Sequence, residues 1–133
     1  MNPFLATDGY KTGHHLMYPK DTITVYSNFT PRSLRHAPTG ITEVVSFGQQ
    51  MVVEQIREMF DKDFFLIDER KFINNGKDII ANKALLQGLK NQVCGEIKKE
   101  YSMYLGTDYD VSHIEDLWEL GYLPIKVKAL PEG

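Results

Sequence analysis

The chain has 133 residues, of which 42% are hydrophobic and 25% charged, and its net charge is −3. This composition is typical of a single compact domain, here residues 1–133, and excludes disordered, collagen-like and low-complexity chains. The acidic balance, the short apolar runs and the lack of a signal-peptide pattern predict a cytoplasmic protein with no nucleic-acid and no membrane partner. The single cysteine excludes an intramolecular disulfide and is typical of a reducing compartment.

The first predicted element is a helix over Thr7–Tyr18. Thr7 is a favourable N-cap residue, and Pro19 follows the expected end of the helix. Gly9 and Gly13 each cost about 1 kcal/mol relative to alanine in a helix interior. We therefore expect this helix to depend on tertiary contacts.

Three segments have the composition of strands. Thr22–Phe29 and Thr42–Phe47 are rich in β-branched and aromatic residues, and Ile125–Leu130 alternates apolar residues with lysines. The basic stretch Thr30–Gly40 contains two prolines and is predicted as a loop. Strands occur both before and after helical runs, so the predicted fold class is α+β, with a small β-sheet and helices packed on it.

Two helical patterns follow Gly48. The first places Val52, Ile56, Met59 and Phe60 on one stripe, so we expect Ile56 to be largely buried. The second runs from Asn74 to Leu105. Its two glycines leave one long helix or two shorter helices equally acceptable.

The clearest helix signal lies near the end of the chain. Ser112 and Glu115 have the spacing of a capping box, and Gly121 is a typical terminator. Trp118 lies on the apolar face of this helix and should be buried. The last strand then leads directly into Pro131–Gly133, which is typical of a fragment of a larger protein, although a short natural chain could end in the same way.

Few residues have the pattern of a catalytic or metal site. His14 and His15 are adjacent, so on a helix they point about 100° apart and cannot share a metal ion as residues i and i+4 do. Cys94 lies in a helical stripe without a nucleophile motif around it. We therefore predict no catalytic residue and no metal site within the chain.

The first forty residues offer a different chemistry. Tyr10 follows the acidic Asp8, and Arg32 lies in the proline-containing loop. An aromatic face suits a flat heteroaromatic ring, and a guanidinium fork suits a phosphate. These three residues are the candidate substrate-binding residues.

Several motifs together resemble the nicotinamide phosphoribosyltransferase family. They are LATDGYK at residues 5–11, His14, Tyr18-Pro19, Val25-Tyr26-Ser27, Phe29, Arg32, Phe47-Gly48, Gln50 and the closing segment Gly121–Gly133. About half of the chain carries the resemblance, which is to the N-terminal region of a bacterial or bacteriophage type. Leu66–Asn91 has no counterpart and is predicted to be a helical insertion.

The resemblance implies a fold and a reaction. The chain would be the N-terminal domain of a type II phosphoribosyltransferase that lacks its α/β barrel. The family joins nicotinamide to 5-phosphoribosyl-1-diphosphate, giving nicotinamide mononucleotide and diphosphate in NAD salvage, with Mg²⁺ bound together with the diphosphate substrate. Its active site lies at the interface of a homodimer. Carried over, Tyr10 would stack on nicotinamide, Arg32 would contact a phosphate, and Asp8 would lie nearby.

Two other functions remain compatible with the sequence. The Thr7, Asp8, Tyr10 and Lys11 core also resembles nicotinate phosphoribosyltransferases, although the PIKVKALPEG ending favours nicotinamide. Alternatively, the chain is a freestanding, non-catalytic domain used for binding or dimerisation. In the leading interpretation the parent protein is an enzyme, and this chain alone is inactive because the barrel is absent from it.

Overall fold

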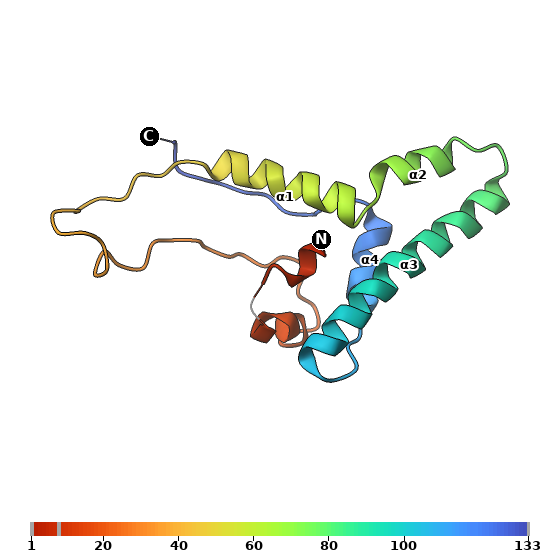
Figure 1. Cartoon of the computed structure of the whole chain (residues 1–133), viewed down its shortest axis with the longest axis horizontal. Helices are drawn as coiled ribbons and strands as arrows, with labels where there is room; N and C mark the ends of the chain where they lie inside the picture. Colours follow the sequence, from red (N-terminus) through yellow and green to blue (C-terminus); the bar gives the residue numbers. More distant parts are fainter. Residues whose placement is uncertain (1, 8, 133) are drawn as a thin grey trace.

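The computed structural model describes residues 2–7 and 9–132, and every regular element among them is a helix. The elements are the 3₁₀ helices η1 (Pro3–Leu5) and η2 (Gly9–Leu16) and the α-helices α1 (Gln49–Asp63), α2 (Ile67–Asn74), α3 (Ile79–Leu105) and α4 (Ser112–Leu120). Figure 1 shows α2 and α4 against α3 and α1 projecting away from it, while the chain between η2 and α1 runs outward in a long extended loop and returns.

The predicted α+β fold is wrong for the described part of the chain. Thr22–Phe29, Thr42–Phe47 and Ile125–Leu130 are extended, yet none of them forms a strand or pairs in a sheet. Their β-branched and aromatic residues favour an extended backbone, but a strand also needs a neighbouring backbone to receive its hydrogen bonds and a surface to cover its side chains. Neither is present here, and Ile23 and Phe29 are 97% and 99% exposed.

The core lies where α3, α4 and the junction between α1 and α2 meet. Its buried apolar side chains are Phe64, Phe65, Val93, Cys94, Ile97, Tyr101, Val111, Ile114 and Trp118. Trp118 is 4% exposed, as predicted, and its indole Nε1 donates a hydrogen bond to the Phe64 carbonyl oxygen at 3.0 Å. This bond fixes the turn after α1 against α4, 54 residues further along the chain.

The prediction for Ile56 is wrong, since its side chain is 37% exposed. Only the C-terminal end of α1 reaches the core, through Phe60, so the stripe that includes Val52 and Ile56 has no helix packed over it. Near the N-terminal end of α1, Gln49 Nε2 donates to the Leu130 carbonyl at 3.2 Å. The C-terminal extended segment therefore runs back along α1 (Figure 1).

The beginnings and ends of α3 and α4 follow local signals. Asp78 caps α3 by accepting hydrogen bonds from the amides of Ile80 and Ala81, and α3 continues without a break to Leu105. In α4 the first-turn contact differs from the predicted capping box, because Asp110 accepts hydrogen bonds from the Ser112 amide and hydroxyl. The predicted end of α4 is confirmed by Gly121, whose φ of 85° is a left-handed conformation that glycine adopts readily.

The segment predicted as an insertion, Leu66–Asn91, contains α2 and the first half of α3. It is helical, and Leu66, Ile67, Leu86 and Leu89 pack against the core. Its status as an insertion relative to the family stays a prediction. Its contacts show that its inner face takes part in the packing of α4.

Candidate functional site

Tyr10 lies on η2, within the segment where an α-helix is predicted. The observed 3₁₀ helix covers Gly9–Leu16, and its tighter winding is consistent with the two glycines that weaken an α-helix there. The Tyr10 side chain is 70% exposed, and its ring centroid lies 5.9 Å from that of His14. Lys11 Nζ lies 5.7 Å from the Tyr10 ring centroid. The ring is therefore accessible to a flat ligand.

Contacts with the loop between α3 and α4 and with α4 itself hold η2 in place. Tyr109 Oη donates a hydrogen bond to the Thr12 carbonyl at 2.6 Å. His15 stacks on His113 with ring centroids 3.8 Å apart and an angle of 22° between the planes. Burial, followed by the nearby Asp110 carboxylate, raises the pKa of the Tyr109 hydroxyl, so Tyr109 stays protonated and able to donate at neutral pH. The position of Tyr10 thus depends on a histidine stack and a tyrosine hydrogen bond.

The lowered pKa of the buried His113 makes stability depend on pH. Desolvation by burial, and then the neighbouring His15, lower the pKa of His113 from its ordinary value of 6.5. Below pH 6.5 the unfolded chain therefore takes up a proton at His113 more readily than the folded chain does. We expect this contribution to stability to be complete above pH 6.5 and to fall progressively as the pH drops toward the lowered pKa. Urea unfolding between pH 5 and 8 measures it.

Two variants separate this effect from general acid unfolding. His113→Phe keeps a ring against His15 but cannot take up a proton, so it should reduce the loss of stability between pH 7.5 and 5.5. His36→Gln removes a histidine from the exposed loop and should leave that loss unchanged. If His113→Phe and the unsubstituted chain lose equal stability over this interval, protonation of His113 is not the cause of the loss.

The candidate residue Arg32 does not join Tyr10. Arg32 is exposed in the extended loop, which Figure 1 shows running away from η2. No hydrogen bond, ion pair or ring contact between Arg32 and Tyr10 occurs in the described part of the chain. Asp8 lies outside the described residues. Within this chain, Tyr10 and Arg32 are two separate exposed positions.

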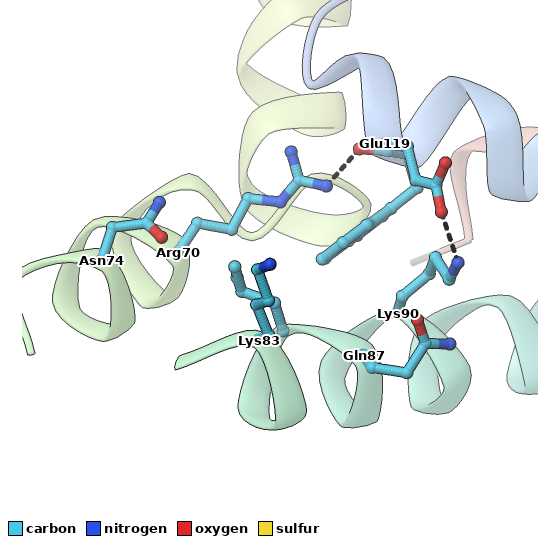
Figure 2. A pocket seen from close by; sticks show the side chains of 8 residues that line it. Arg70, Asn74, Lys83, Gln87, Lys90 and Glu119 are labelled. Carbon is cyan, nitrogen blue, oxygen red and sulfur yellow. Dashed lines mark hydrogen bonds and ion pairs between the residues drawn. The ribbon is translucent and has the colours of Figure 1, made fainter. Parts of the chain in front are cut away.

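A groove between α2, α3 and α4, which the sequence analysis missed, brings several charged residues together. Figure 2 shows Arg70 from α2, Lys83 and Lys90 from α3, and Glu119 from α4 around it. A pattern on α3 could have revealed part of this groove. Lys83, Gln87 and Lys90 follow at i, i+4 and i+7, which places their side chains on one helix face.

Among residues 2–7 and 9–132, no group of three or more histidine, cysteine, aspartate or glutamate side chains could hold a metal ion. None of the helices described is long and apolar enough to cross a membrane.

Comparison with known sequences shows which class of protein the chain is similar to. The whole chain aligns with a phosphoribosyltransferase, with 36% identity over 138 aligned positions. This relative is the nicotinamide phosphoribosyltransferase of Acinetobacter baylyi, and the chain spans 23% of its length. The similarity confirms the resemblance to nicotinamide phosphoribosyltransferases. No protein-family model and no solved structure matches the chain.

Proposed function

We propose that the chain is the N-terminal part of a nicotinamide phosphoribosyltransferase and supplies Tyr10 and Arg32 to the substrate site. The observation that carries this proposal is the 36% identity to such an enzyme along the whole chain. The proposed reaction transfers a phosphoribosyl group from 5-phosphoribosyl-1-diphosphate to nicotinamide, with diphosphate as the leaving group. The similarity to a nicotinamide phosphoribosyltransferase supports nicotinamide rather than nicotinate as the substrate.

The exposed apolar side chains of the extended loop support a role within a larger assembly. Ile23, Phe29 and Phe47 are almost wholly or largely exposed, and they lie on segments whose backbone pairs with no strand in the described part of the chain. Contiguous exposed apolar surface is typical of an interaction site. We take the covering surface to be the remainder of the enzyme and its partner subunit in a homodimer.

Two side chains would do separate work in this proposal. The exposed ring of Tyr10 offers a π face on which nicotinamide can stack. The planar guanidinium of Arg32 offers paired donors to a phosphate of the donor substrate. Mg²⁺ would arrive with the diphosphate and supply charge stabilisation. The described residues do not fit a protein cage for it, so no step through the metal is assigned to this chain.

The test is steady-state kinetics on the full-length enzyme, with each substrate varied in turn. Tyr10→Ala should weaken the use of nicotinamide by about 1 kcal/mol, or roughly fivefold in kcat/KM, because stacking is lost. Tyr10→Phe should be much milder, since stacking needs no hydroxyl. Arg32→Ala should mainly raise the KM for the phosphoribosyl donor, and Arg32→Lys should restore it only in part.

Separate outcomes would contradict each role. Stacking is wrong if Tyr10→Ala lowers the melting temperature but leaves the KM and kcat for nicotinamide intact. A higher kcat/KM for nicotinate than for nicotinamide would assign the alternative substrate. Heterodimers of Tyr10→Ala subunits with subunits inactivated in the barrel should recover one working site of two. No recovery would place both sets of residues in one subunit's site and contradict the shared interface.

A further inference from the structure

We propose that the groove between α2, α3 and α4 binds a small organic phosphate, at a site separate from Tyr10 and Arg32. Its volume is about 470 Å³, within the range of roughly 300–1,000 Å³ typical of small-molecule sites. Its walls combine cationic side chains with amide groups and with the apolar surface of Leu86 and Trp118. This mixture suits a molecule that has one anionic end and one less polar part.

The groove is electropositive in a chain whose net charge is −3. Arg70, Lys83 and Lys90 supply three positive charges, and Glu119 supplies one negative charge. Lys90 is buried and its ammonium lies 2.6 Å from Glu119 Oε1, so these two groups neutralise each other. Neither Arg70 nor Lys83 forms an ion pair with a described residue. Two positive charges therefore remain, which matches a phosphate dianion.

Arg70 is held in place before any ligand arrives. Its guanidinium carbon lies 3.4 Å from the centroid of the Trp118 ring, and its Nη2 donates to the Trp118 carbonyl oxygen (Figure 2). A Cβ at Gly121 would lie 3.0 Å from Arg70 Nη1, so glycine lets the guanidinium keep this position without a shift of a few tenths of an ångström. A fixed guanidinium loses less conformational entropy when it binds an anion than a freely rotating one does.

The unbound groove leaves the Arg70 charge poorly compensated. Desolvation by burial lowers the pKa of Arg70, and its Nε is buried without a hydrogen-bond partner in the described part of the chain. A partly buried cation without a counter-charge is costly, and a bound anion offsets that cost. The groove thus has an electrostatic reason to take up an anion.

The surrounding side chains favour a phosphate that carries an organic group. Lys83 is exposed at the groove edge, so its long side chain can swing toward an anion beside Arg70. The amides of Asn74 and Gln87 offer further donors to phosphate or hydroxyl oxygens. An inorganic phosphate would fill only part of the space, whereas an organic group could cover Leu86.

Trp118 gives a direct measurement, because it is the only tryptophan in the chain and lines the groove. The full chain is titrated with phenyl phosphate, inorganic phosphate and sulfate at constant ionic strength, and indole fluorescence is followed. We expect a saturable change with phenyl phosphate, a weaker one with inorganic phosphate, and the weakest with sulfate. Isothermal titration calorimetry with the same solutions should give a stoichiometry of one ligand per chain.

Two variants test the named cations. Lys83→Gln removes an exposed charge that the fold does not need, and it should weaken phenyl phosphate binding by about tenfold, the size expected for a lost charge-assisted hydrogen bond. Arg70→Lys keeps the charge but loses the planar fork, and it should weaken binding while the folded circular dichroism spectrum persists. Lys71→Gln is the matched control, since Lys71 is exposed on α2 and does not line the groove.

Three results would overturn the proposal. They are an unsaturable response to phenyl phosphate, unchanged affinity in Lys83→Gln, and an equal loss of affinity in Lys71→Gln, which would indicate general attraction to lysines. Arg32→Gln separates this groove from the proposed substrate site. Loss of phenyl phosphate binding in Arg32→Gln alone would place the ligand at the loop, while unchanged binding there supports the groove and leaves the proposed function to its own kinetic test.

Discussion

Trp118→Ala should lower the free energy of unfolding by about 3–5 kcal/mol, the range for removing a large buried aromatic ring. The indole projects from α4 into the core, donates a hydrogen bond to the Phe64 carbonyl and carries the stacked guanidinium of Arg70. Small domains have a total stability of about 5–15 kcal/mol, so this loss is a large share of it. Urea unfolding followed by circular dichroism measures the change.

Trp118→Phe is the control that separates packing from hydrogen bonding. It keeps an aromatic ring under Arg70 but removes the donor to the Phe64 carbonyl. Its expected cost is about 1–3 kcal/mol, the penalty for leaving a buried polar group unsatisfied together with a small cavity. The placement of Trp118 in the core would be contradicted if the free energy of unfolding of Trp118→Ala lay within about 1 kcal/mol of that of the unsubstituted chain.

Phe64→Ala should cost a similar amount, about 3–5 kcal/mol, and should also release the N-terminal segment. The Phe64 side chain is fully buried and packs edge-on against Phe4 of η1, with ring centroids 4.9 Å apart. Tyr101 Oη donates to the Phe4 carbonyl, and the Phe4 ring also packs edge-on against Phe60, so η1 is held at Phe4 by two ring contacts and one hydrogen bond. Losing the contact with Phe64 removes the closer of the two ring contacts and should expose η1 to proteolysis before the helices unfold.

Phe72→Ala is the matched control for this substitution. Phe72 lies on α2 and is 82% exposed, so the same chemical change there should alter stability by less than about 0.5 kcal/mol. Limited proteolysis should then cut Phe64→Ala near η1 while sparing Phe72→Ala. Equal proteolysis of the two variants would mean that Phe64 does not anchor η1.

Local signals in the sequence were sufficient for the beginning of α1 and the end of α4. Gly48 immediately before α1, and Gly121 immediately after α4, are residues whose effect acts within one turn, and the structure has helix ends at both positions. The burial of Trp118 also followed from its place on the apolar face of a short helix. These features depend on neighbours a few residues away, so a sequence pattern contains them.

Non-local contacts explain what the sequence did not predict. Strand composition describes only the preferred backbone of Thr22–Phe29, whereas a sheet depends on which other segment lies beside it, and in the described part of the chain none does. Ile56 has helical periodicity, yet only the end of α1 meets the core. Arg70 joins Trp118 across 48 residues, a distance over which no periodicity indicates contact.

The candidate site also combines features that depend on local sequence with contacts that depend on the fold. Tyr10 and Arg32 were chosen from residue chemistry and family resemblance, and the structure adds that the Tyr10 ring is accessible on η2. The histidine stack beneath η2 was not foreseen, because His15 and His113 lie far apart in sequence. Their contact requires the fold of α3 and α4 to be known.

The extended loop between η2 and α1 has a consequence for how the protein is made. The helical core is assembled from elements that follow one another in the chain, so it can form early and quickly. Residues 22–47 instead form no helix or strand and expose apolar side chains to solvent. Exposed apolar side chains and unpaired extended backbone favour aggregation of nascent chains. In the proposed assembly, the surface that covers this stretch would therefore also protect the chain from aggregation.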